Sequence, residues 1–156
     1  MIKILFICHG NICRSPMAEF IMKKMVADAE LSDRIYVESA ATSSEELDNP
    51  VYPPARAELA RHGLSCNGKR ARQITDRDYE NFDYIICMEK YNIRNMKRRL
   101  GRYESDPQAK ISLLLDYTDK PGDIDDPWYT GLFAEVYDQI AAGCRGLLTH
   151  IISNEL

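Results

Sequence analysis

Short apolar runs and longer stretches with helical spacing alternate along this chain. The short runs are rich in β-branched residues and are the expected strands. They lie at Ile2–Ile7, Ile35–Val37, Tyr84–Cys87 and Ile111–Leu115.

Elsewhere, apolar residues recur every three or four positions, which predicts helices with one buried face. The expected helices are Pro16–Ala29, Ala55–His62, Asp76–Asn81, Lys90–Leu100 and Leu132–Ile152. Alternating strands and helices predict an α/β fold with a mostly parallel sheet and helices on both faces. Ligands of such folds bind beyond the carboxyl ends of the strands.

The chain has 156 residues, and we expect residues 1–156 to form one domain. A chain of this length buries about 68–70% of the surface that it would expose when unfolded. Two loops, 39–54 and 116–131, are long for such a domain, and long loops in compact domains are often functional.

Composition excludes several classes of protein. The 20 basic and 24 acidic residues give a net charge of −4, so we expect no nucleic-acid or membrane partner. The first apolar run is too short to span a bilayer and lacks a signal-cleavage site, which favours a cytoplasmic location. Five cysteines without a CxxC pair argue against a disulfide framework and against zinc.

The segment from Cys8 to Arg14 carries the clearest chemical signal. It follows the first expected strand and precedes Ser15-Pro16, where a helix is expected to start. Backbone N–H groups in such a loop, together with the helix dipole, favour an anion such as phosphate. The loop amides of His9, Gly10, Asn11, Ile12, Cys13 and Arg14 are therefore the expected phosphate ligands.

The same segment supplies a nucleophile. Loop amides and a nearby guanidinium stabilise a thiolate, so Cys8 is expected to attack phosphorus and form a phosphocysteine. Arg14 would hold the phosphate oxygens, and Ser15 would donate its hydroxyl to the departing thiolate. Asn11 would brace the loop from inside, and Gly10 would provide a positive φ or a close approach to the anion.

A cysteine and an arginine at this spacing are more often structural when they occur alone. Here the preceding strand, the internal Gly and Asn and the following Ser-Pro all match the needs of a phosphate site. The context therefore favours catalysis.

The stretch Cys8–Glu19 resembles the signature of the low-molecular-weight protein tyrosine phosphatases. Further blocks resemble those of the family in order and spacing, namely Glu38–Ser43, Ala71–Gln73, Phe82–Met88 and Asp126–Tyr129. The resemblance covers essentially the whole chain. It implies a four-stranded parallel sheet flanked by helices and hydrolysis of protein phosphotyrosine, without a cofactor or metal.

An aryl phosphate also needs a general acid to protonate its leaving oxygen. Asp123, Asp125 and Asp126 crowd the second long loop. The match to the family indicates Asp126 as the acid, with Asp125 as the fallback, whereas Asp123 fits an acidic turn. Trp128 and Tyr129 would form flat walls for an aromatic leaving group, with Ile12 as an apolar floor, although packing is the commoner role of such a pair.

Two departures from the family pattern bear on substrate choice and on support of the loop. Ser44-Glu45-Glu46 stands where many relatives carry an aromatic residue, which makes that rim acidic and disfavours strongly acidic substrates. The segment Cys66–Arg72 replaces a histidine that relatives use in buried hydrogen bonding beside Ser39 and Asn11, so the bracing of Asn11 stays open.

Two other functions remain alternatives. A thioredoxin-coupled arsenate reductase shares the spacing of Cys8 and Arg14, but it needs two further relay cysteines, and only Cys87 is in place. A non-catalytic phosphate-binding module would keep Arg14 while losing Cys8 or Asp126. We expect phosphotyrosine proteins or peptides as substrates, phosphate-like oxyanions as inhibitors, and a monomer.

Overall fold

The computed structural model describes residues 1–156 and contains one four-stranded sheet in the order β2-β1-β3-β4. The central strand β1 (Ile2–Cys8) pairs with β2 (Ile35–Ala41) and with β3 (Tyr84–Cys87), and β3 pairs with β4 (Ile111–Leu113). All three pairings are parallel. The predicted α/β fold with a parallel sheet is confirmed.

Three strand ends differ from the prediction, and the smallest change is that β1 continues by one residue to Cys8. β2 continues to Ala41 because its small residues pair with the end of β1, Ser39 opposite Phe6 and Ala41 opposite Cys8. Ser39 therefore lies on a strand rather than in the first long loop. β4 ends at Leu113, and the next residues form the 3₁₀ helix η1 (Leu114–Tyr117).

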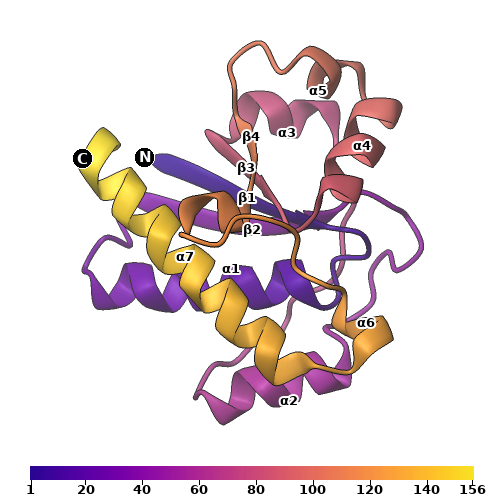
Figure 1. The fold of residues 1–156 in the computed structure, drawn as a ribbon, viewed down its shortest axis with the longest axis vertical. Helices are drawn as coiled ribbons and strands as arrows, with labels where there is room; N and C mark the ends of the chain where they lie inside the picture. The colour runs from indigo at the N-terminus through magenta and orange to yellow at the C-terminus, as the bar shows by residue number, and fades with distance from the viewer.

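Helices cover both faces of the sheet, as predicted (Figure 1). One face carries α1 (Arg14–Asp28), α2 (Pro53–Arg61) and α7 (Phe133–Glu155). The other carries α3 (Asp76–Asn81), α4 (Lys90–Arg99) and α5 (Gly101–Ser105). The prediction missed α5 and the four-residue α6 (Pro127–Thr130), because such short helices have too few residues to show a period.

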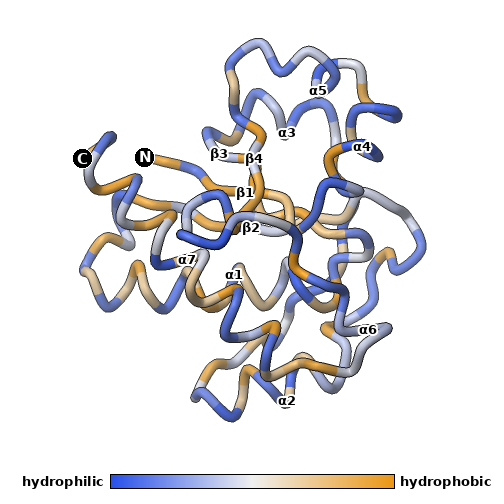
Figure 2. The backbone as a smooth tube through the Cα atoms, viewed as in Figure 1, coloured by the Kyte–Doolittle hydropathy of each residue, from blue (hydrophilic) through white to orange (hydrophobic).

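Alternate residues of β1 enter two different cores. Ile4 and Phe6 belong to the core beneath α1 and α7, whereas Leu5 and Ile7 belong to the core beneath α3, α4 and α5, and all four are fully buried. Figure 2 shows the matching apolar colour along the central strands and alternating apolar and polar turns in α7. A continuous apolar run is what a strand buried on both faces requires.

The longest helix, α7, packs closely against η1. A Cβ added at Gly146 would lie 1.9 Å from the backbone oxygen of Tyr117. Only glycine allows this approach, which explains a residue that otherwise weakens a helix interior. No helix, α7 included, has both the length and the apolar character needed to cross a membrane.

The strand order places a ligand site beside Cys8. The chain leaves β1 toward β2 and later crosses to β3 on the other side of β1. The carboxyl ends of β1 and β3 thus flank the point where the direction of winding changes, which is where open α/β sheets bind ligands. Cys8 ends β1, and Met88, just after β3, donates its N–H to the Ile7 carbonyl at 3.2 Å.

Candidate active site

The loop between β1 and α1 presents a row of free donors. None of the backbone N–H groups from His9 to Cys13 donates to a backbone carbonyl. Asn11 adopts a left-handed conformation with φ of 58°, which asparagine tolerates better than most residues. Successive N–H groups in such a turn, placed before a helix, form a concave anion site.

Two local expectations for this loop need correction, namely one of the two roles given to Gly10 and the start of the helix. The positive φ belongs to Asn11 and not to Gly10. At Gly10, an added Cβ would lie 3.3 Å from Cγ of Glu46, so glycine there permits the close approach of the neighbouring loop. Helix α1 begins at Arg14, two residues before the expected Pro16, because a proline fits within the first turn, where its missing N–H costs no hydrogen bond.

Arg14 is buried at the base of the site and is held from two sides. Its Nη1 donates to Oε2 of Glu89 at 2.5 Å and to the Ile124 carbonyl at 2.8 Å, and its Nη2 lies 3.3 Å from Oδ2 of Asp126. Burial opposes the charge, but Cys8, Asp126 and Glu89 raise the pKa of Arg14. Its Nε is buried without a partner in the protein, so that N–H is free to bind an anion oxygen.

Cys8 is one of two cysteines in this loop, and its surroundings differ from those of Cys13. Its Sγ lies 3.0 Å from Oγ of Ser15 and accepts from the Ser15 N–H at 3.4 Å. Burial, and next the negative charge of Cys8, raise the pKa of the Cys13 thiol far above its usual value. Cys13 therefore stays protonated at neutral pH and is no competing nucleophile.

A chain of hydrogen bonds orients the hydroxyl of Ser15. The Asn11 amide donates from Nδ2 to Ser15 Oγ at 2.7 Å and to Ser39 Oγ at 2.9 Å, while its Oδ1 accepts from the Arg72 N–H at 3.2 Å. The bond from Arg72 fixes which end of the amide faces Ser15. Because Ser15 accepts from Asn11, its own proton is left for the sulfur of Cys8.

The series of hydrogen bonds continues from Ser39 to a buried ion pair between Lys69 and Glu19. The Ser39 hydroxyl donates to Oε1 of Glu19 at 2.6 Å, and Nζ of Lys69 lies 3.2 Å from the same oxygen. Lys69 also donates to the Ser39 backbone carbonyl at 2.9 Å. Burial lowers the pKa of Lys69, and the charge of Glu19 acts in the opposite direction. Lys69 and Glu19 thus brace Ser39, and through it Asn11.

Of the three loop aspartates, only Asp126 faces the site. Its Oδ1 accepts from the Trp128 N–H at 3.0 Å and caps α6, which leaves Oδ2 toward Arg14. Asp125 is exposed and does not line the pocket, and Asp123 accepts from the N–H of Lys90 at 3.0 Å. This supports the choice of Asp126 over the fallback.

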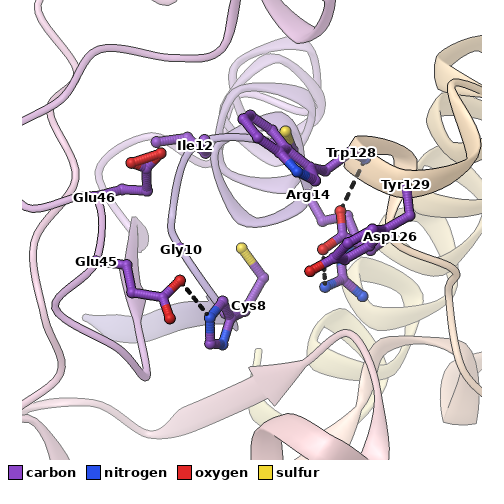
Figure 3. Close-up of a pocket in the computed structure, with 11 residues that line it drawn as sticks. Cys8, Gly10, Ile12, Arg14, Glu45, Glu46, Asp126, Trp128 and Tyr129 are labelled. Atoms are coloured by element: carbon purple, nitrogen blue, oxygen red, sulfur yellow. Dashed lines mark hydrogen bonds and ion pairs between the residues drawn. The ribbon is translucent and has the colours of Figure 1, made fainter.

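A pocket opens above Cys8 and is lined by residues of three loops. The lining residues are Cys8, His9, Gly10, Ile12, Cys13, Arg14, Glu45, Glu46, Asp126, Trp128 and Tyr129. Figure 3 shows the Cys8 sulfur between Glu45 and Glu46 on one side and Asp126, Trp128 and Tyr129 on the other. The predicted acidic rim and aromatic wall therefore both border this pocket.

The two wall residues differ in their support. The ring of Trp128 packs 4.6 Å from the ring of Tyr52, whereas Tyr129 is 83% exposed. On the rim, Nε2 of His9 lies 3.0 Å from Oε2 of Glu45. The ring of Trp128 is therefore supported by Tyr52, whereas most of the Tyr129 side chain is exposed to solvent.

Sequence reasoning missed several supporting residues, namely Glu19, Tyr52, Lys69, Arg72 and Glu89. Glu89 comes two residues after a buried strand, where polar side chains often reach a ligand site, and this signal was available. Glu19, Lys69 and Arg72 lie in the segments Cys8–Glu19 and Cys66–Arg72 that the resemblance had marked, but their contacts were not predicted, and Tyr52 had no local signal.

Comparison with known proteins gives consistent matches over the whole chain. The family described as low molecular weight phosphotyrosine protein phosphatase matches residues 3–155. The low molecular weight protein-tyrosine-phosphatase YfkJ of Bacillus subtilis is 40% identical over 153 residues, 97% of this chain and 96% of its own. The human low molecular weight phosphotyrosine protein phosphatase is 41% identical over 149 residues, 94% of this chain and 93% of its own.

Solved structures agree with the sequence matches. The crystal structure of YfkJ from Bacillus subtilis superposes with a TM-score of 0.94 at 39% identity and covers 100% of this chain and 98% of that chain. The protein tyrosine phosphatase of Entamoeba histolytica, with Hepes in its active site, superposes with a TM-score of 0.89 at 30% identity and full coverage of both chains.

Proposed function

The chain belongs to the low molecular weight phosphotyrosine protein phosphatase family, and from this premise we propose how its own residues hydrolyse protein phosphotyrosine. The observation that carries the proposal is the surroundings of Cys8. Its sulfur lies among unpaired loop amides, beside the free Nε of the buried Arg14, with Asp126 in the same pocket.

In the first step, the Cys8 thiolate attacks phosphorus, and the bond from phosphorus to the tyrosine oxygen breaks. Asp126, as the protonated acid, gives its proton to the leaving oxygen, so tyrosine departs as a neutral phenol. Arg14 and the loop amides hold the three equatorial oxygens, where negative charge gathers in the transition state. The product is a phosphocysteine.

In the second step, water replaces the thiolate. The Asp126 carboxylate takes a proton from the water as it attacks phosphorus, and the bond from sulfur to phosphorus breaks. The Ser15 hydroxyl, 3.0 Å from the sulfur, stabilises the thiolate that leaves. Phosphate then departs, and the site returns to its initial state.

The aromatic wall explains a preference for phosphotyrosine. A phenyl ring bound to phosphate would lie against Trp128, over Ile12, whereas the shorter phosphoserine would leave that wall uncovered. Loss of such apolar contact lowers kcat/KM by about 10–200-fold. The site therefore favours aryl over alkyl phosphates.

The experiment that tests this function compares three peptides of one sequence carrying phosphotyrosine, phosphoserine or phosphothreonine, in excess chelator. We expect kcat/KM for phosphotyrosine to be about 10–200-fold higher, and mass spectrometry of acid-quenched enzyme to find phosphate on Cys8. Equal rates for the three peptides, or phosphate on no cysteine, would contradict the proposal.

The acidic rim predicts a selectivity among phosphotyrosine peptides. Glu45 and Glu46 border the pocket beside Cys8, so peptides with Lys or Arg next to phosphotyrosine should be preferred over acidic ones. In the Glu45→Gln/Glu46→Gln double variant, we expect the ratio of kcat/KM for basic and acidic peptides to fall about tenfold at low salt.

Hydrolysis of p-nitrophenyl phosphate is the control for this double variant. Since this small ester carries no flanking residues, its kcat/KM should stay within about twofold of the native value. An unchanged peptide ratio, while the ester is still hydrolysed, would show that the rim does not select substrates.

The two alternative functions are less well supported. Arsenate reduction by relay would require two accessible cysteines, but Cys87 is fully buried in β3, and the next cysteine is Cys144 in α7. A silent binding module would have no use for Asp126 beside Arg14. We further propose a cytoplasmic location, which the five free cysteines fit, a monomeric state, and inhibition by oxyanions that occupy the place of phosphate.

A further inference from the structure

We propose that Lys69 is a positioning residue for the catalytic loop, acting through Ser39 and Asn11 on the Ser15 hydroxyl that contacts Cys8. The inference rests on the proposed function, because it concerns the step in which the Cys8 thiolate leaves phosphorus. Lys69 lies outside the pocket and touches neither the sulfur nor the bound phosphate of the mechanism.

Lys69 holds Ser39 at two points. Its Nζ donates to the Ser39 carbonyl at 2.9 Å and pairs at 3.2 Å with Oε1 of Glu19, the atom that accepts the Ser39 hydroxyl. The backbone and the side chain of Ser39 are thus fixed by one ammonium group. The side chains of Lys69 and Glu19 are only 10% and 4% exposed.

The ionised Glu19 sets the direction of the whole chain of hydrogen bonds. A carboxylate only accepts, so Ser39 must donate to it and must accept from Asn11. The amide of Asn11 is then committed to donate both protons, one to Ser39 and one to Ser15. The proton of Ser15 is left for the sulfur of Cys8, where the departing thiolate needs a donor.

The backbone conformation of Asn11 explains why this support is needed. The Asn11 backbone is left-handed, with φ of 58°, a conformation that asparagine tolerates better than most residues but that still costs free energy and is kept by surrounding contacts. Three hydrogen bonds to Ser15, Ser39 and Arg72 hold it here. Loss of the ammonium would leave Oε1 of Glu19 with the Ser39 hydroxyl as its one partner and would remove the bond to the Ser39 carbonyl, which loosens Ser39.

Lys23 offers a matched control, because it contacts the same carboxylate without contacting Ser39. Its Nζ lies 2.6 Å from Oε2 of Glu19, and its side chain is 45% exposed. An i,i+4 helix pair whose lysine is half-exposed contributes little. Lys23→Met and Lys69→Met therefore remove the same charge from the same partner, but only Lys69→Met releases Ser39.

The experiment measures pre-steady-state hydrolysis of p-nitrophenyl phosphate by the native protein, Lys69→Met, Lys69→Arg and Lys23→Met. The burst of p-nitrophenol counts enzyme able to form phosphocysteine, and turnover divided by burst amplitude is the rate per active site. We expect this rate to fall about tenfold in Lys69→Met, as for loss of one well-placed hydrogen bond.

The controls separate positioning from folding. A purely structural role of Lys69 would lower the burst amplitude and leave the rate per active site unchanged, which would overturn the proposal. Lys23→Met should stay within about twofold of the native rate, and Lys69→Arg, which keeps the charge, should retain most of it. An equal loss in Lys23→Met and Lys69→Met would also overturn the proposal.

Failure of the proposed function has a different signature. A native protein without burst or turnover would overturn the phosphatase mechanism and this inference together. If the native protein is active and Lys69→Met has the native rate per active site, only the proposed role of Lys69 is overturned.

Discussion

Replacing Cys8 by serine is expected to reduce hydrolysis of a phosphotyrosine peptide on the order of 10⁴-fold or more. A serine hydroxyl stays protonated at neutral pH, and the only side chain bonded to Cys8 Sγ is that of Ser15, which is no base. The replacement is nearly isosteric and Cys8 is buried, so the fold should persist. Steady-state kinetics together with thermal unfolding measure both effects.

Binding should survive in Cys8→Ser, because Arg14 and the loop amides that hold phosphate are unchanged. Calorimetric titration with a phosphotyrosine peptide would measure this. Cys66→Ser makes the same chemical change at a buried cysteine outside the pocket and should keep native turnover. More than a tenth of native activity in Cys8→Ser would rule out a covalent mechanism through Cys8.

Replacing Asp126 by asparagine is expected to lower kcat for a phosphotyrosine peptide by about 10²–10⁴-fold, the usual range for loss of a general acid–base group. The asparagine oxygen can still accept from the Trp128 N–H at 3.0 Å, so the start of α6 should remain in place. The loss should be smaller for p-nitrophenyl phosphate, whose leaving group needs less help from an acid.

Asp125→Asn is the matched control for Asp126→Asn, since it makes the same change one residue earlier on an exposed side chain. It should leave kcat unchanged for both substrates. A large loss in Asp125→Asn with little loss in Asp126→Asn would transfer the acid role to Asp125 and would mean that the loop rearranges when substrate binds.

Local features of the sequence determined the fold class and the centre of the site. The run Ile2–Ile7 is apolar at nearly every position, as a strand buried on both faces must be, and the segment Cys8–Arg14 directly follows it. A strand, a tight loop and a helix start are set by neighbouring residues, so Cys8 and Arg14 could be placed at the two ends of this loop without coordinates. The long helix α7 was equally evident, from its period.

Tertiary structure alone decided how this loop is held. Glu89 reaches Arg14 from 75 residues away, and Lys69 braces Ser39 from 30 residues away. Such contacts arise only after the sheet has brought the carboxyl ends of its strands together, and no local periodicity encodes them. The resemblance left open what supports Ser39 and Asn11 in place of the histidine of relatives. In the folded protein, the Lys69 ammonium takes this place and pairs with Glu19.

The loop that contains Asp123, Asp125 and Asp126 shows the same difference between what local sequence and what long-range contacts determine. The sequence by itself determined that three carboxylates lie before Trp128, but it did not determine which of them points at Arg14. That depends on the Ile124 N–H, which donates to the Met88 carbonyl at 2.9 Å and anchors the loop to the end of β3. Composition and spacing thus determined the chemistry that this protein carries, and long-range hydrogen bonds decided its geometry, because each joins groups whose distance only the folded chain defines.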